Sequence, residues 1–379
     1  MRSRFKPLVI GALLVLAVPV EPVGAAGRVG LKQRSFHLGF TPFAYDLTLE
    51  AVETTYSLTG ANSDIVAHHL DGGVPWPEAL AGDPYHPNVE GDLDLRVGHL
   101  LPAQRIYLAV TPISFVRDGM ALYWGESVNM PLPPPWNSRG LDHPEVIAAY
   151  ISYCLYMIER FQPDYMAYGI EVDLLALSDP VAYQQFAVLA AAVYPALKAV
   201  YPDLPIFLTF TIPHDETLEA LRPVIEQVLS FTDMMAVSTY PFLTGLERPA
   251  QIPTDWFSRM RDLAPELPFA VAETGLIAQP LVLESLQVTI PGRELWQTQY
   301  VGRLLREADR LHAEFVIWFV PVDYDLLWDR LQDQGVDEFY KLWRDCGLWD
   351  GELGPRRGLF LWRQWLRQRW VEPGKGMHE

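Results

Sequence analysis

Two stretches of the sequence have the pattern of a buried strand that ends in a glutamate. One covers residues 164–173 and contains Glu171, and the other covers residues 268–275 and contains Glu273. A carboxylate is costly to bury, so each glutamate should lie where its strand emerges into a cleft. Two carboxyl groups that face each other can cleave a glycosidic bond with retention, one as acid and base and the other as nucleophile. Glu171 and Glu273 are therefore the predicted catalytic pair.

Alternating strand and helix patterns recur along the chain at the spacing of βα units. In addition to the strand that contains Glu171, seven strands are predicted, at residues 37–46, 64–70, 105–111, 205–211, 234–240, 269–272 and 314–320. Helices are predicted at residues 48–58, 143–161, 179–200, 215–229, 254–263, 294–311, 337–343 and 358–370. This order predicts an α/β fold, a single-domain (β/α)8 TIM barrel. Such barrels place catalytic groups at the carboxyl ends of the strands, so the fourth and seventh strands would present both glutamates to one mouth.

Long connections at residues 71–104, 114–142 and 277–292 should shape the cleft. The first is predicted to be irregular. Trp124 and Trp136 fall in the second, and ordered aromatic side chains there would offer flat apolar surfaces to sugar rings. The alternative for each loop tryptophan is plain packing. Aromatic residues on the predicted helices, such as Trp343, are expected to pack in the outer layer.

The end of the second strand offers a cluster of polar and aromatic side chains, His68, His69, Asp71 and Trp76. Successive strand residues point to opposite faces, so at most one of the two histidines faces the mouth. The cluster is a candidate for binding substrate. Structural hydrogen bonding is the main alternative, and a metal site is disfavoured because no HxH or HExxH spacing occurs.

Further candidates for substrate binding at the mouth are His214, after the fifth strand, and Asp173, beside Glu171. Asp173 is also the residue best placed to take over the role of Glu171. The sequence contains no glycine-rich phosphate loop, no dinucleotide fingerprint and no Gly-x-Ser-x-Gly motif. No cofactor and no metal are therefore predicted.

The order of these segments resembles the large clan of (β/α)8-barrel retaining β-glycosidases, which includes the endo-β-1,4-galactanases and the cellulase-like barrels. The resemblance covers nearly the whole mature chain. It implies that Glu171 is the acid and base, that Glu273 is the nucleophile, and that Tyr240 donates a hydrogen bond to the nucleophile. It also implies that Trp318 forms a floor under the sugar. Residues 346–351 resemble the closing segment of the clan.

One position departs from the pattern of the clan. The acid/base glutamate is usually preceded by an asparagine that hydrogen-bonds the sugar 2-hydroxyl, and here that position is Ile170. A contact to the 2-hydroxyl that strengthens in the transition state contributes several kcal/mol in such enzymes. Its loss implies another donor, a substrate that lacks the contact, or a barrel that binds without cutting.

Composition narrows the class of partner. The 379 residues have a formal net charge of −18, and such a surface repels nucleic acid and anionic membranes. Residues 1–26 have the basic start, apolar run and small-residue end of a signal peptide, so we expect a secreted or periplasmic protein. The expected organisation continues with a barrel domain at residues 27–373 and a polar tail at 374–379. Cys154 and Cys346 are expected to be free and mostly buried thiols.

These observations predict an exported glycoside hydrolase that cleaves a β-linked neutral glycan with retention, acting on an oligo- or polysaccharide. The alternative is a non-catalytic barrel that binds polysaccharide, which the isoleucine before Glu171 favours. A metal-dependent barrel hydrolase is a third hypothesis. The sugar, the linkage, endo or exo action and the oligomeric state stay open at the level of the sequence.

Overall fold

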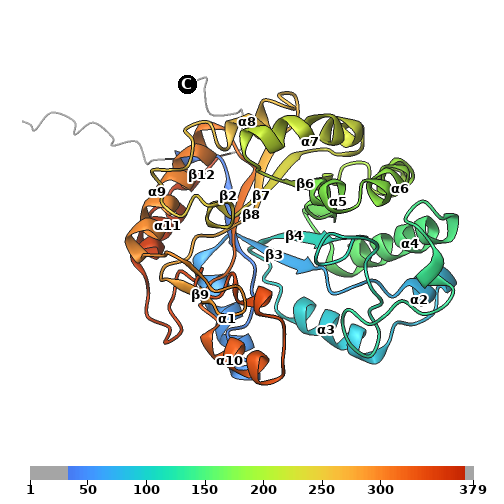
Figure 1. The fold of residues 1–379 in the computed structure, drawn as a ribbon, viewed down its shortest axis with the longest axis horizontal. Helices are drawn as coiled ribbons and strands as arrows, with labels where there is room; N and C mark the ends of the chain where they lie inside the picture. Colours follow the sequence, from blue (N-terminus) through green and yellow to red (C-terminus); the bar gives the residue numbers. More distant parts are fainter. Residues whose placement is uncertain (1–32, 372–379) are drawn as a thin grey trace, which may run out of the picture. The chain divides into compact units, whose positions relative to one another are not determined.

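A computed structural model describes residues 33–371 of the protein. Its centre is a closed barrel of parallel strands in the order β11-β2-β3-β4-β5-β6-β7-β8 (Figure 1). The barrel strands are β2 (His37–Phe40), β3 (Ile65–Leu70), β4 (Arg105–Val110), β5 (Tyr165–Gly169), β6 (Ile206–Thr211), β7 (Met235–Thr239), β8 (Phe269–Thr274) and β11 (Phe315–Trp318). The predicted (β/α)8 TIM barrel is confirmed. The predicted signal peptide and polar tail lie outside the described residues.

Aromatic and small side chains fill the inside of the barrel. The ring of Tyr107 stacks on Phe207 with centroids 5.7 Å apart and lies 5.0 Å from the ring of Phe315. Alanines such as Ala67 and Ala167 complete this buried cluster. Because these residues point inward from neighbouring strands, they form a packed core and leave no channel along the barrel axis.

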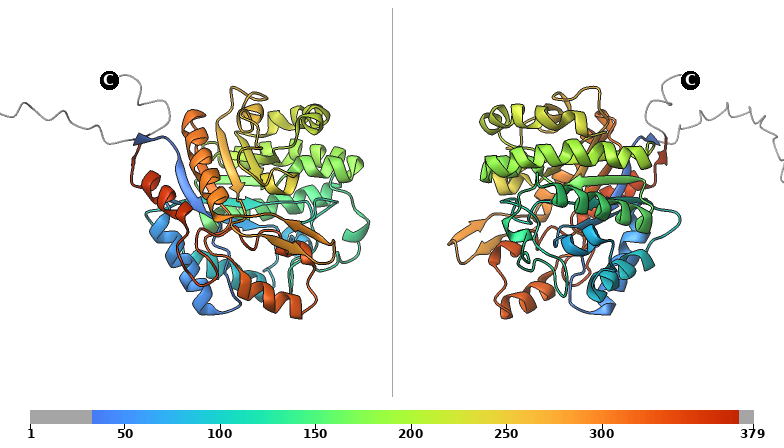
Figure 2. Two further views of the ribbon diagram at one scale, coloured as in Figure 1. Left: turned by 60° about the vertical axis from the view of Figure 1, so that its left-hand side comes forward. Right: turned by 90° about the vertical axis from the view of Figure 1, so that its right-hand side faces the viewer.

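The helices surround the barrel, as the two views of Figure 2 show. They are α1 (Leu49–Asn62), α2 (Trp76–Ala81), α3 (Pro87–Gly98), α4 (Pro144–Phe161), α5 (Val172–Ser178), α6 (Pro180–Val200), α7 (Asp215–Val228), α8 (Ser258–Arg261), α9 (Glu294–Arg310), α10 (Asp325–Asp333) and α11 (Arg357–Leu366). Two of them, α4 and α6, begin with a proline in the first turn, as predicted. The carboxylate of Asp179 caps α6 by accepting hydrogen bonds from the amides of Val181 and Ala182, each at 3.0 Å.

The connection at residues 71–104, predicted to be irregular, contains α2 and α3. The prediction was wrong because both helices have weak periodic signals. In α3 the side chains that are buried belong to Val89 and Leu93 alone, and Gly91 interrupts it. Tertiary packing against α4 and the barrel therefore decides the helical state here, not local propensity.

Several other elements differ from prediction. The helix expected at residues 254–263 is reduced to α8, and the one expected at 337–343 is the 3₁₀ helix η4 (Glu338–Lys341). The helices α5 and α10 were not predicted. Two short pairs of strands lie outside the barrel. The strands β1 (Gln33–Arg34) and β12 (Arg369–Trp370) pair with each other, and the hairpin of β9 (Leu281–Leu283) and β10 (Val288–Ile290) projects from the barrel (Figure 2).

Both cysteines are free and fully buried, as predicted. Cys154 lies on α4, and Cys346 lies in the irregular segment before α11. Within residues 33–371, no helix combines the length and the apolar character needed to cross a bilayer.

Candidate active site

Glu273 lies near the carboxyl end of β8, and both of its carboxylate oxygens have hydrogen-bonding partners. The hydroxyl of Tyr240, directly after β7, donates to Oε1 at 2.5 Å. On the other side, Nδ1 of His69 lies 2.9 Å from Oε2. The pairing register of β7 and β8 shifts between Val237 and Ser238, so that Ser238 pairs with Glu273. A side chain held at both oxygens in this way keeps one orientation toward the mouth of the barrel.

Glu171 directly follows β5 and begins the short helix α5. Its backbone is left-handed, with φ 50° and ψ 46°, a conformation that costs free energy for any residue except glycine. Its amide donates to the Thr209 hydroxyl at 2.8 Å, which holds this turn in place. The side chain of Ile170 is buried with the barrel core. The turn therefore directs Glu171 to the mouth while its neighbour fills the interior.

An unbroken chain of charged groups joins the two glutamates. Arg117, in the loop after β4, places Nη2 3.2 Å from Oε2 of Glu171 and 3.2 Å from Oδ2 of Asp71. The same Asp71 oxygen lies 3.4 Å from Nε2 of His69, whose other nitrogen contacts Glu273. The structure thus brings both predicted catalytic residues into one electrostatic network.

The pKa values of this network follow from burial and neighbouring charge. Burial raises the pKa of Glu171, and the negative charge of Glu273 raises it further, against the opposing effect of Arg117. Burial disfavours the imidazolium of His69, but Glu273 and Asp71 outweigh it and raise its pKa to about 10. His69 is therefore protonated at neutral pH and donates to carboxylates on both sides. The pKa of Asp71 is lowered, because His69 and Arg117 outweigh its burial.

The network lies in a pocket of about 1040 Å³ at the carboxyl ends of the barrel strands. The side chains of Glu171 and Glu273 are 18% and 14% exposed, so both are largely desolvated and still reachable from the pocket. A concave site of this volume is large enough for a small ligand. This arrangement has the elements of acid–base and nucleophilic chemistry in one cavity.

Six of the predicted site residues line this pocket. They are Glu171, Glu273, His69, Asp71, His214 and Tyr240. His214 lies at the rim, where its Nε2 is 2.7 Å from the carbonyl oxygen of Thr244. The contact from Tyr240 to Glu273 has the geometry that the resemblance implies.

Four predicted residues do not line the pocket. His68 points outward from β3 and is buried against Phe161 at 5.2 Å, and burial lowers its pKa to about 3. The carboxylate of Asp173 is buried and accepts hydrogen bonds from the amide and hydroxyl of Thr211. Alternation along β3 explains the first case, and the fixed turn of α5 explains the second.

The tryptophans Trp76 and Trp318 are also away from the pocket, and both are fully buried. The indole of Trp76 donates to the Ala121 carbonyl at 2.9 Å, and its ring stacks on Trp136 at 5.9 Å. The indole of Trp318 donates to the Cys346 carbonyl at 2.8 Å. Both are packing residues in this structure, so Trp318 is not a floor beneath the pocket.

Among the lining residues that were not predicted as site residues are Arg117, Phe319 and Trp343. Arg117 lies in a loop, where no motif in the sequence identifies an arginine as a site residue. Phe319 follows Trp318 and lines the pocket in its place. Trp343, predicted to pack in the outer layer, also lines the pocket, with its ring 5.8 Å from that of Tyr240 in an edge-to-face arrangement. Alternation indicates only that Trp318 and Phe319 face opposite sides, so no signal in the sequence decides which of them lines the pocket.

A group of acids outside this pocket is close enough to share an ion. Asp323, Asp325 and Asp345 have carboxylate oxygens within 4.8 Å of one another. Arg356 pairs with Asp323, and Arg344 lies 2.9 Å from Asp345. These arginines supply the positive charge that the cluster requires, and the buried pairs fasten the segment after β11 to the start of α11.

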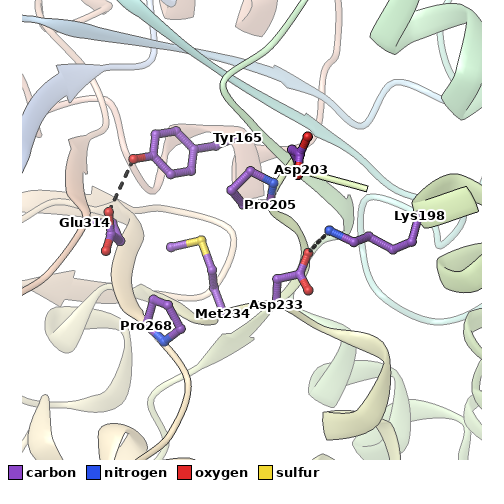
Figure 3. A pocket seen from close by; sticks show the side chains of 8 residues that line it. All are labelled: Tyr165, Lys198, Asp203, Pro205, Asp233, Met234, Pro268 and Glu314. Atoms are coloured by element: carbon purple, nitrogen blue, oxygen red, sulfur yellow. Dashed lines mark hydrogen bonds and ion pairs between the residues drawn. The ribbon is translucent and has the colours of Figure 1, made fainter. Parts of the chain in front are cut away.

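A second pocket, of about 310 Å³, lies at the opposite end of the barrel (Figure 3). Its lining includes Tyr165 at the start of β5, Met234 before β7 and Glu314 before β11. Lys198 reaches in from α6 and pairs with Asp233 at 2.9 Å. This is the amino-terminal end of the strands, which in such barrels serves stability.

Comparisons with known proteins find structural likeness only. No protein-family model and no curated protein sequence matches this chain. An exo-β-1,4-mannosidase from Opitutaceae bacterium strain TAV5 aligns with a TM-score of 0.57 and 15% identity, over 88% of this chain and 59% of its own. This chain therefore spans less than two thirds of the mannosidase.

Two shorter proteins are covered more fully. A GH5_18 protein from Streptomyces cattleya, solved in complex with Manb1-4GlcNAc, aligns with a TM-score of 0.60 and 12% identity over 89% of this chain and 83% of its own. The Ignisphaera aggregans GH53 catalytic domain aligns with a TM-score of 0.52 and 17% identity over 81% and 87%. The protein therefore shares the (β/α)8-barrel fold of glycoside hydrolases.

Proposed function

We propose that the protein is a glycoside hydrolase that cleaves a β-linked neutral glycan with retention of configuration. The observation that supports this most directly is the pair of glutamates at the ends of β5 and β8, which share one pocket and one charge network. The raised pKa of Glu171 suits a general acid, and the doubly held carboxylate of Glu273 suits a nucleophile.

Each group has a defined task in this mechanism. Glu171 protonates the glycosidic oxygen while Glu273 attacks the anomeric carbon, and a covalent glycosyl-enzyme forms as the leaving group departs. Glu171, now ionised, removes a proton from water, which attacks the same carbon and releases the sugar. Tyr240 and the protonated His69 hold the nucleophile toward the anomeric carbon. Arg117 stabilises Glu171 while it is ionised.

A neutral substrate fits the charges of the pocket. The guanidinium of Arg117 is occupied by Asp71 and Glu171, and His69 is occupied by Asp71 and Glu273. These cations are therefore not free to pair with a sugar carboxylate. A uronic acid would also approach two carboxylates that are already desolvated, at an electrostatic cost.

The test replaces each glutamate by alanine and measures hydrolysis of p-nitrophenyl β-glycosides of glucose, galactose and mannose. For Glu273→Ala, added azide should restore turnover and yield the α-glycosyl azide. For Glu171→Ala, azide should yield the β-glycosyl azide, because the glycosyl-enzyme still forms. The matched control is Glu266→Gln, an exposed position before β8. Wild-type rates in both alanine variants would refute the proposal.

A barrel that binds polysaccharide without cutting it is the second candidate. It is favoured by Ile170, whose buried side chain offers no hydrogen bond to a sugar 2-hydroxyl. Calorimetry against a glycan panel, combined with an assay for new reducing ends, separates the two candidates. Binding without any release of reducing ends would support the second and exclude the first.

We further propose that the protein is exported and that its barrel acts in a secreted or periplasmic setting. The support is the pattern of residues 1–26 in the sequence. Determination of the first residue of the mature protein tests this proposal. A mature chain that begins at Met1 would refute it.

A further inference from the structure

The side of the pocket next to the general acid is apolar. A leaving group departs on the side of the acid, because that carboxyl must reach the glycosidic oxygen. The two segments adjoining Glu171 there are the loop after β4 and the helix α5. They line the pocket with the side chains of Phe115, Val116, Leu174 and Leu177.

The two segments form one wall. The hydroxyl of Ser178 donates to the carbonyl oxygen of Arg117, which ties the end of α5 to the loop. Val116 and Leu177, each one residue before this contact, are 59% and 53% exposed. Apolar side chains this exposed within a concave site favour a ligand that removes them from water.

Aromatic side chains extend this wall. The ring of Phe115 stacks on Tyr340 with centroids 4.9 Å apart and planes 7° from parallel, and it meets Phe339 edge-on at 6.0 Å. Phe339 and Tyr340 belong to η4 and also line the pocket. Since η4 comes from the segment after β11, the contact joins two distant parts of the rim into one apolar surface.

This wall has few hydrogen-bonding groups for a second sugar. Residues 115–116 and 174–177 have no polar side chain. The neighbouring guanidinium of Arg117 is directed to Asp71, to Glu171 and to the carbonyl oxygens of Ser114 and Phe115. Among the wall residues named above, the hydroxyl of Tyr340 alone could replace water at a sugar hydroxyl, so binding of a second sugar here is unfavourable.

We propose that the leaving-group side of the pocket binds an apolar aglycone, an alkyl or aryl alcohol, and not a second sugar. This rests on the proposed function and narrows its substrate to β-glycosides of apolar alcohols. In the first step, Glu171 gives its proton to the glycosidic oxygen, the bond from that oxygen to the anomeric carbon breaks, and Glu273 forms a new bond to that carbon. The free alcohol then leaves along the apolar wall.

The first experiment measures kcat/KM of the wild-type protein for methyl, butyl, hexyl and octyl β-glycosides below their micelle concentrations. The sugar is the one whose p-nitrophenyl glycoside is cleaved fastest. These alcohols differ little in acidity, so the series isolates binding. We expect kcat/KM to rise about fourfold per methylene, as for burial of a CH₂ group, until the wall is covered. A flat series, or a β-1,4-disaccharide cleaved faster than the octyl glycoside, would overturn the proposal.

The second experiment places polar side chains in the wall. Leu177→Gln and Val116→Thr should each lower the octyl-to-methyl ratio of kcat/KM severalfold. The matched control is Val188→Thr on the outer face of α6, where the valine is 52% exposed. An unchanged ratio in both wall variants would contradict the proposal. A gain from phenyl to 2-naphthyl glycosides that exceeds the alkyl gain would identify the alcohol as aromatic.

Calorimetry with the methyl and octyl glycosides separates this proposal from the proposed function. Tighter binding of the octyl glycoside without any hydrolysis would support the apolar aglycone site and contradict the catalytic assignment. Hydrolysis that depends on both glutamates but not on the length of the alkyl chain would support the catalytic assignment and contradict the apolar aglycone site.

Discussion

The two ends of the barrel use carboxylates in opposite ways. At the amino-terminal end, Asp64, Asp164 and Asp233 each accept a hydrogen bond from a backbone amide of a neighbouring strand, at Leu38, Ile106 and Ile206 respectively, at 2.7–2.8 Å. Each also pairs with its own basic side chain, at Arg34, Arg105 and Lys198 respectively. At the carboxyl end, Glu171, Asp71 and Glu273 share two cations, Arg117 and His69, and make none of these amide contacts.

This difference separates stability from chemistry. A carboxylate that accepts strand amides and has its own cation fixes the register of the sheet, so its removal should weaken folding. At the carboxyl end, burial and the neighbouring Glu273 outweigh the shared cation Arg117 and raise the pKa of Glu171, whereas Asp71, which contacts both cations, has a lowered pKa. The same functional group, a carboxylate, therefore serves the fold at one end and reactivity at the other, and its partners decide which.

The largest effect is expected at the nucleophile. Glu273→Gln should lower kcat on the order of 10⁴-fold, because the covalent step is lost. The midpoint of thermal unfolding should change little, since the amide can still accept the hydrogen bond from Tyr240. Steady-state kinetics and a thermal melt measure both. A midpoint of thermal unfolding that is lower by many degrees would place Glu273 among the structural carboxylates instead.

Loss of one donor to the nucleophile should have the next largest effect. Tyr240→Phe is expected to reduce kcat by roughly 10²- to 10³-fold, as for removal of one preorganised donor at a reacting group. The matched control is Tyr324→Phe, which also lines the pocket but whose hydroxyl donates to the Tyr340 carbonyl at 2.7 Å. Equal losses in the two variants would show that the hydroxyl of Tyr240 has no special role.

At the other end of the barrel, Asp233→Ala should destabilise the protein and spare its activity. Asp233 accepts from the Ile206 amide at 2.8 Å, from Lys198 at 2.9 Å and from the Tyr194 hydroxyl at 2.6 Å. Loss of these contacts should lower the free energy of unfolding by about 2–3 kcal/mol. Urea titration measures this, with Asp203→Asn from the same pocket as the control. A loss of kcat/KM in the folded variant would contradict the division between the two ends.

The smallest effect concerns pH. Burial and Glu273 raise the pKa of Glu171, and Arg117 opposes them. Removing this cation in Arg117→Gln should raise the pKa of Glu171 further, so the acid stays protonated to higher pH. The alkaline limb of the kcat/KM profile should then move to higher pH, whereas Arg117→Lys should keep it near its wild-type position. Movement to lower pH in Arg117→Gln would show that Glu171 is not the acid.

Local patterns in the sequence predicted the strands and the two glutamates, because strand periodicity and the cost of burying charge act over a few residues. These patterns failed where the prediction depended on which of two adjacent side chains faces the pocket. Trp318 has the type expected beneath a sugar, but Phe319 faces the pocket. His68 and His69 could be distinguished only once the orientation of β3 was known.

By itself, the sequence determined the barrel and the placing of Glu171 and Glu273 at its mouth, since each follows from hydrophobic runs and their ends. Only the tertiary structure decided that Arg117 joins Asp71 to Glu171 and that η4 meets the loop after β4. Those contacts connect residues far apart in the chain. Their energies depend on distances and burial that no local pattern encodes.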